Sequence, residues 1–230
     1  MRVLEKIRRI PAVYAKEGLG GLGRAVAGRL IEHTEFVAAQ RDLREPPLPA
    51  GCSLAFEIRR VDDALFERFR SMPAPLPRHF EYRIVYGMRN CYAAWVGDDL
   101  GAVMWPVFAA DNRRMVTRWR FLLPDEARVS NIWASPAYRG TGLIDACFER
   151  FERLFAAAGF RYFYTFTWVG NHASRKLSAR RGYREVGTIH RYALPWLREG
   201  NGLYIRSAIP REPLATHHPG GDMELPERIG

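Results

Sequence analysis

The chain has 230 residues, of which 47% are hydrophobic, and carries a formal net charge of +10. This length is enough to bury a substantial core, in one large domain or in one domain with an extension. No apolar run approaches the ~18–20 residues of a transmembrane helix and no secretory signal is recognisable, so we expect a cytoplasmic protein. The three cysteines are odd in number and widely spaced, which predicts reduced thiols and no metal site or disulfide framework.

The first 33 residues show apolar positions at helical spacing with basic residues between them. We therefore expect two helices, the second over about Leu22–His33, with a kink or break at Pro11 and a flexible joint at 18–23. A basic amphipathic start can contact a membrane surface peripherally. The alternative is packing on the chain's own domain or on the second subunit of a homodimer.

Proline-rich and glycine-rich stretches suggest the domain limits. Residues 34–43 are a candidate short strand, although their alternation is poor, and the proline-rich stretch 44–51 reads as a linker. We therefore predict an N-terminal helical extension and linker over 1–50 and a main domain over 51–209. The tail 210–230 is rich in proline and glycine and is predicted to be flexible.

The first half of the main domain predicts strands and helices in alternation. Period-two and period-3.6 patterns, turn residues and prolines define each element. In chain order we expect a strand at 54–58, a helix from Asp62, a rigid loop at 73–77, a helix over 78–88, a hairpin of 91–96 and 102–108, and strands at 115–121 and 129–134.

The second half predicts a long helix between two strands. One apolar face recurs over 142–158, followed by a strand at 162–168 and a helix from Asn171 to Gly182. Strands at 183–192 and 203–209 complete the sheet. The helical crossover implies one parallel strand pair, so the fold class is α+β with a single mixed, mainly antiparallel sheet.

One stretch combines a strand end, two glycines and the start of a helix. It reads Ser135-Pro136-Ala137-Tyr138-Arg139-Gly140-Thr141-Gly142-Leu143-Ile144. The first N–H groups of a helix have no intrahelical partner, and the helix dipole adds partial positive charge there. Because glycine allows an anion to approach the backbone closely, this turn is predicted to hold a pyrophosphate.

That turn and a second stretch together resemble the GNAT superfamily of acyl-CoA-dependent N-acyltransferases. Tyr138-Arg139-Gly140-Thr141-Gly142-Leu143 after a strand is similar to the family's acyl-CoA signature. Asn171-x-x-Ser174, followed by Gly182-Tyr183, is similar to its second signature. Both lie at the family's spacing, and the strand, two helices and hairpin over 54–108 follow the family's order.

The resemblance implies a GNAT-like fold in which a bulge splays the parallel strand pair and helices cover both faces of the sheet. It implies acyl-CoA, expected to be acetyl-CoA, as co-substrate, no metal, and direct attack by an amine of an unknown acceptor in a ternary complex. Residues at the family's cofactor positions are Ile132, Trp133, Ala134, Arg139, Gly140, Thr141, Gly142, Leu143, Ile144, Asn171 and Ser174. The family usually has Gly or Ala at position 144.

The catalytic positions depart from the family. Acyl transfer needs a neutral amine, so a base or water chain must take its proton, and the leaving thiolate can use an acid. Ser130 stands where the family often has a glutamate base, and Ser178 where it often has a tyrosine acid. Ser130 and Asn131 could order a water. Further candidates are Glu81, His79 and Glu126 as bases, and Tyr164 and Tyr183 as acids.

The positive charge and these departures leave alternatives. Residues 171–192 carry six basic side chains against Glu185 alone, which is typical of a phosphate-rich ligand or of a solvated basic face. No nucleic-acid motif accompanies the charge, so we expect no specific nucleic-acid partner. The alternative function is a catalytically degenerate acyl-CoA-binding module that acts as a sensor or partner protein.

Overall fold

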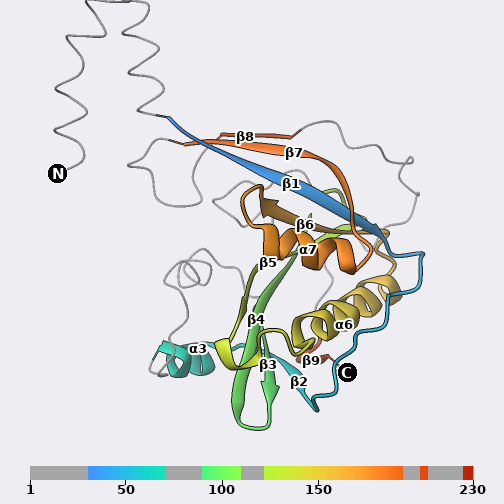
Figure 1. Ribbon diagram of the computed structural model, residues 1–230. Helices are drawn as coiled ribbons and strands as arrows, with labels where there is room; N and C mark the ends of the chain where they lie inside the picture. Colours follow the sequence, from blue (N-terminus) through green and yellow to red (C-terminus); the bar gives the residue numbers. More distant parts are fainter. Residues whose placement is uncertain (1–30, 71–89, 110–121, 194–202, 207–224, 230) are drawn as a thin grey trace, which may run out of the picture.

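A computed structural model describes residues 31–70, 90–109, 122–193, 203–206 and 225–229, and its strands form one nine-stranded sheet (Figure 1). The strand order is β8-β7-β1-β6-β5-β4-β3-β2-β9. All neighbours pair antiparallel except β5 and β6, which run parallel, so the predicted mixed sheet is confirmed. The strands are β1 (Glu32–Asp42), β2 (Glu57–Arg60), β3 (Tyr92–Val96), β4 (Asp99–Phe108), β5 (Glu126–Ala134), β6 (Tyr162–Trp168), β7 (Arg184–Ala193), β8 (Leu203–Arg206) and β9 (Arg228–Ile229).

Three α-helices pack on this sheet within the described residues. They are α3 (Asp63–Arg70), α6 (Leu143–Ala157) and α7 (His172–Arg180), and a short 3-10 turn, η2 (Pro136–Tyr138), precedes α6. α6 connects the parallel strands β5 and β6, as a crossover between parallel neighbours requires. Figure 1 shows α6 and α7 beside each other, well away from α3.

Apolar side chains cover both faces of the sheet. On one face, Phe148, Phe151 and Phe155 of α6 pack against strand residues such as Phe163, and each is at most 1% exposed. On the other face, Phe66 and Phe69 of α3 pack with a second set of strand residues. Full burial of such a side chain contributes about 1.5–3 kcal/mol. The predicted arrangement with helices on both faces is therefore confirmed.

Most predicted elements in the described residues are present. α6 begins and ends within one residue of the predicted 142–158, and Gly159 follows it with φ +83. The β3–β4 hairpin, β6 and the helix after Asn171 also match the prediction. The strand predicted at 54–58 is displaced to Glu57–Arg60.

The sheet extends beyond the predicted domain limits of 51 and 209 at both ends. β1, expected to be a short strand of the extension, has eleven residues and lies between β6 and β7. Glu32 and His33 belong to this strand, so the prediction of a helix up to His33 is wrong at these two residues. At the other end, Arg228–Ile229 pairs with β2, so the flexible-tail prediction is wrong there. Interior strands need hydrogen-bonded partners on both edges, and these terminal segments provide them.

Other predictions lie outside the described residues. They concern the helices within 1–30, the loop 73–77, the helix 78–88 with Glu81 and His79, and the strand 115–121.

Candidate functional site

The parallel strands β5 and β6 separate after a short stretch of pairing. They pair only over Glu126–Val129 and Tyr162–Thr165, although β5 continues to Ala134 and β6 to Trp168. Asn131 has φ +46 and lies where β5 gains one residue against β4. Asparagine tolerates this left-handed conformation, and such a bulge bends a strand. The separation opens a cleft along which, in the described part of the chain, the β5 edge has no partner strand.

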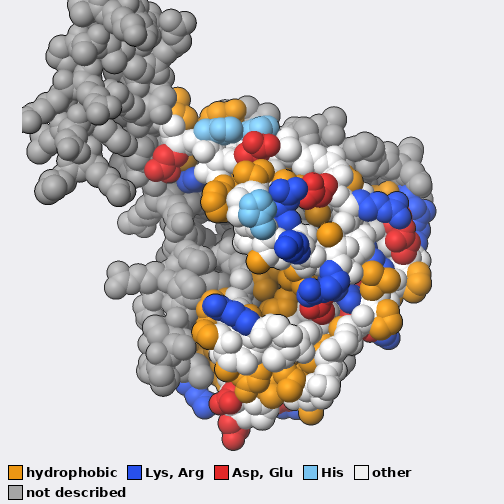
Figure 2. Space-filling model, in the orientation of Figure 1, with side chains coloured by type: hydrophobic (Ala, Val, Ile, Leu, Met, Phe, Trp, Pro, Cys, Tyr) orange, Lys and Arg blue, Asp and Glu red, His pale blue; other side chains and the backbone are white. Residues whose placement is uncertain are grey.

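A groove of about 880 Å³ leads from this cleft to the N-terminus of α6, within the ~300–1,000 Å³ of small-molecule sites. Figure 2 shows a hollow on this side of the molecule, with apolar side chains in its floor and Lys or Arg side chains on its rim. All eleven residues at the expected cofactor positions line the groove. The sequence signatures therefore mark positions that the fold brings together. The groove's other lining residues are Pro49, Ala50, Gly51, Tyr138, Asp145, Ala173, Leu177, Arg180 and Arg181.

The turn before α6 offers backbone N–H groups to the groove. Gly140 and Gly142 have φ +79 and +81, a conformation that side chains rarely adopt. Among the hydrogen bonds of the described residues, none is donated by the N–H groups of Gly140, Thr141, Gly142 or Ile144. Because the dipole of α6 adds positive charge here, these donors fit a bound pyrophosphate.

The opposite wall of the groove is formed by α7. Asn171 accepts a hydrogen bond from the Ser174 N–H at 3.2 Å and so caps this helix. Such a cap would stabilise a helix in any fold. Asn171 also lines the groove, which its capping role does not require. Asn171 and Ser174 thus face the same space as Ile132–Ala134 of β5.

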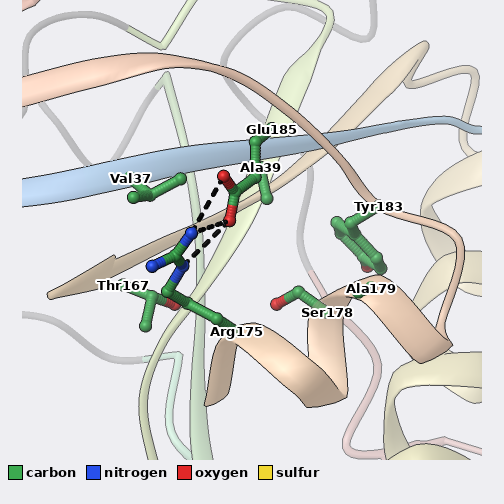
Figure 3. Close-up of a pocket in the computed structure, with 8 residues that line it drawn as sticks. All are labelled: Val37, Ala39, Thr167, Arg175, Ser178, Ala179, Tyr183 and Glu185. Atoms are coloured by element: carbon green, nitrogen blue, oxygen red, sulfur yellow. Dashed lines mark hydrogen bonds and ion pairs between the residues drawn. The ribbon is translucent and has the colours of Figure 1, made fainter. Parts of the chain in front are cut away.

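Most arginines around the groove are already paired. Arg180 of α7 forms hydrogen bonds of 3.1 and 2.6 Å with Asp145 of α6. This carboxylate raises the pKa of Arg180 and adds negative charge to the first turn of α6. Arg175 pairs with Glu185 at 2.9 Å (Figure 3), and the Arg139 Nε donates to the carbonyl of the last β5 residue at 3.3 Å. The positive rim is therefore partly neutralised.

The basic residues around Arg181 in the sequence suggested a solvated basic face, but the Arg181 side chain is buried. Its side chain is 2% exposed and pairs with Glu152 at 2.7 Å, and Arg41 approaches the same carboxylate at 3.5 Å. Tyr183 donates to Glu152 at 3.0 Å. Burial raises the pKa of Glu152 against the opposing effect of the two arginines. One shared acidic partner, Glu152, makes these two cations tolerable inside the protein, and no local sequence pattern reveals this pairing.

The end of the stretch 46–51 forms a wall of the groove, which the sequence did not predict. Pro49, Ala50 and Gly51 line the groove, and the Ala50 N–H donates to Glu149 of α6 at 2.7 Å. Its prolines exclude helix and central strand, which is why it reads as a linker. They carry no information about the surface on which such a segment packs.

The two serines at the expected catalytic positions lie in the cleft and are already hydrogen-bonded. Ser130 is 8% exposed and accepts from Arg128 at 2.5 Å. Ser178 shares a hydrogen bond of 3.0 Å with Thr165, and Figure 3 shows its hydroxyl pointing from α7 towards the sheet. Both serines are therefore satisfied buried groups.

The remaining acid and base candidates in the described residues are also buried and paired. Tyr164 donates to Glu126 at 3.1 Å, and neither residue is exposed. Burial and the nearby Glu152 raise the pKa of Tyr183 well above its usual value. A tyrosine with a raised pKa is a weak proton donor near neutral pH, so the structure does not favour Tyr183 as the acid.

No family model matches the sequence, and comparison with characterised proteins found no match. Among solved structures, a GCN5-related glucosamine N-acetyltransferase region of a fungal multi-domain GH3 β-N-acetylglucosaminidase has a TM-score of 0.55 at 12% identity. A Drosophila protein has a TM-score of 0.51 at 16% identity. A GCN5-related N-acetyltransferase from Sphaerobacter thermophilus has a TM-score of 0.49 at 12% identity.

These matches cover 75%, 76% and 80% of this chain, but only 22%, 58% and 60% of the other chains. The chain thus spans less than two thirds of each of them. The first match shows that the chain has the GCN5-related N-acetyltransferase fold, as the resemblance implied. Within the described residues, no helix is long and apolar enough to cross a bilayer, and no group of three acidic, His or Cys side chains is placed to hold a metal.

Proposed function

We propose that the chain is an acyl-CoA-dependent N-acyltransferase of the GNAT superfamily, with acetyl-CoA as co-substrate and an amine as acceptor. The early separation of β5 and β6 carries this proposal, because it leaves an open strand edge that leads to free N–H groups at the start of α6. An extended ligand with amide groups at one end and a pyrophosphate at the other matches both parts of the groove. When bound, acyl-CoA would supply the acyl group as a reactive thioester.

Each part of the groove then has a role in binding. The N–H groups of Gly140–Ile144 would hold the pyrophosphate. The open edge of β5 at Ile132–Ala134 would hydrogen-bond the pantetheine arm as an added strand does. One N–H group there would stabilise the oxyanion that develops on the carbonyl under attack. Asn171 and Ser174 would contact the lower part of the arm.

Proton transfer is assigned to water held by polar groups of the cleft. The acceptor nitrogen attacks the carbonyl carbon, the C–N bond forms, the C–S bond breaks and the thiolate leaves. Ser130 and Asn131 line this part of the cleft and would order the water that takes the amine proton. Because Ser130 already accepts from Arg128, it would orient that water and would not act as the base itself.

A catalytically degenerate acyl-CoA-binding module is the second candidate. The groove contains every expected cofactor position, whereas the acid and base candidates among the described residues are buried and paired. Such a chain would bind the cofactor and transfer nothing.

Free thiol release from acetyl-CoA, measured with a panel of amines, tests the proposal. We expect at least one amine to raise thiol release above the hydrolysis background. Tight binding of coenzyme A without amine-dependent release would favour the second candidate, and absence of binding would overturn both.

Two glycines with matched backbone conformation make the test specific to the groove. Gly140 (φ +79) and Gly97 (φ +59) both have open space where a Cβ would lie, but Gly97 belongs to the β3–β4 turn outside the groove. Gly140→Asp places a carboxylate against the pyrophosphate site and should weaken coenzyme A binding by about tenfold or more. Gly97→Asp carries similar backbone strain and should retain wild-type affinity.

A further inference from the structure

The stretch Pro46–Gly51, here called the strap, connects the region after β1 to the groove. Its last three residues form one wall of the groove. The Gly51 carbonyl oxygen would be 2.9 Å from a Cβ placed on Gly142, so the two backbones are in close contact. The strap therefore directly contacts the turn Gly140–Ile144, where the pyrophosphate would bind.

The composition of the strap limits how it can be held in place. Three of its six residues are prolines, which have no N–H group. Two buried arginines instead bind its carbonyl groups. Arg41 Nη2 donates to the carbonyl of Pro46 at 2.5 Å, and Arg181 Nη1 donates to that of Leu48.

A buried carboxylate fixes both arginines. Glu152 is 1% exposed and lies 2.7 Å from Arg181 and 3.5 Å from Arg41. Arg41 also donates to the Arg181 carbonyl at 2.9 Å. Ion pairs of this kind are costly to break once buried, so the first half of the strap is held in one position.

Within the described residues, one hydrogen bond anchors the second half of the strap to α6. The Ala50 N–H donates to Glu149 Oε2 at 2.7 Å. Glu149 also pairs with Arg153, four residues later, at 2.6 Å, and the Arg153 side chain is 65% exposed. Burial opposes ionisation of Glu149, but the hydrogen bonds from Arg153 and Ala50 lower its pKa, so the strap is held by a carboxylate at neutral pH.

We infer that the strap is a positioning element of the acyl-CoA groove, and that Glu149 sets cofactor affinity through Ala50 without lining the groove. The inference rests on the proposed function, since its ligand is the acyl-CoA of that proposal. Loss of the Glu149 anchor lets Ala50 and Gly51 move away from Gly142. The wall beside the pyrophosphate site then becomes mobile, and binding must order it again. The reacting end of the cleft, at Ile132 and beyond, is unaffected.

Three substitutions separate this role from a general effect on stability. Glu149→Ala removes the acceptor for Ala50, whereas Glu149→Gln keeps an oxygen acceptor there. Arg153→Ala removes the exposed partner of Glu149 and leaves the strap contact. Coenzyme A binding by calorimetry, amide exchange over residues 48–52, and melting temperature are measured for each variant. Glu149→Leu, which keeps side-chain bulk but has no acceptor, is the second variant if Glu149→Ala does not fold.

We expect Glu149→Ala to weaken coenzyme A binding by about tenfold and to speed exchange over 48–52, because a hydrogen bond to a charged group is lost. KM for acyl-CoA should rise with kcat unchanged. Glu149→Gln and Arg153→Ala should stay within about twofold of wild type. Wild-type affinity in Glu149→Ala, or unchanged exchange over 48–52, overturns the inference while the proposed function stands. Absence of coenzyme A binding by the wild type overturns the proposed function and the inference with it.

Discussion

At Gly142, the backbone conformation and the contact with the strap both require that no Cβ atom is present. The Gly142 φ of +81 is left-handed, which costs a non-glycine residue about 1–2 kcal/mol. An alanine Cβ would also lie 2.9 Å from the Gly51 oxygen and 3.3 Å from its carbonyl carbon. Since these are backbone atoms of an anchored strap, relief needs movement of the strap, and overpacking of this kind costs about 1–3 kcal/mol. Gly142→Ala should therefore destabilise the protein by about 2–5 kcal/mol.

Gly140 supplies the matched control. Its φ is +79, but nothing lies within 4 Å of an added Cβ. Gly140→Ala should therefore cost only the backbone term of about 1–2 kcal/mol. Urea unfolding of the two variants, with equal m-values, gives the difference directly. Coenzyme A titration of the folded variants should show the larger loss of affinity in Gly142→Ala. Equal stability of the two variants would refute the close contact between the strap and the turn.

Three further predictions concern charge, pH and the core. Asp145→Asn removes a negative charge from the first turn of α6 and frees Arg180, so coenzyme A should bind about two- to fivefold tighter at low salt, and weaker binding would contradict this. Burial raises the pKa of Tyr183 in the folded protein above that in the unfolded chain. The stabilising contribution of Tyr183 is therefore complete below about pH 10. Above this pH the free energy of unfolding falls, by at most about 1.4 kcal/mol per pH unit. Tyr183→Phe should give a shallower decline of unfolding free energy above pH 10, and an unchanged slope would exclude this role. Phe151 is fully buried and packs edge-on against Tyr92, so Phe151→Ala should cost about 3–5 kcal/mol by urea unfolding, and a loss below 1 kcal/mol would contradict its place in the core.

The central unit from β5 to the start of β7 was predictable because its local signals agree with its packing. Gly142 starts α6, Asn171 caps α7 and Gly182 ends it, and each of these roles is set within one helical turn. The apolar face of α6 is also continuous in the sequence. Local conformation and tertiary burial therefore point to the same elements.

β1 shows where sequence reasoning was insufficient. Its pairing partners in β6 and β7 are more than a hundred residues away, and no local pattern specifies such pairing. Val37, Ala38 and Ala39 are all buried in succession, because β1 is an interior strand. Strands buried on both faces lose the alternation that identifies them.

The strap and its buried ion pairs were missed for a related reason. Arg41, Glu152 and Arg181 have the composition of a solvated surface, and only their three-dimensional pairing makes burial tolerable. A proline-rich segment likewise predicts the absence of regular structure and leaves its packing surface open. A bulge in the strand before the turn, by contrast, was expected from the family resemblance. The structure places it at Asn131, and asparagine suits the left-handed conformation there.

Amide hydrogen exchange with and without acetyl-CoA tests most directly whether the groove holds the cofactor. Saturating acetyl-CoA should slow exchange at Ile132–Ala134, on the open edge of β5, and at Gly140, Thr141, Gly142 and Ile144, whose N–H groups donate no hydrogen bond within the described residues. Gly97, outside the groove, should be unchanged. Slowed exchange at both stretches is the predicted result. Unchanged exchange at both, under conditions where acetyl-CoA is bound, would show that the ligand binds elsewhere.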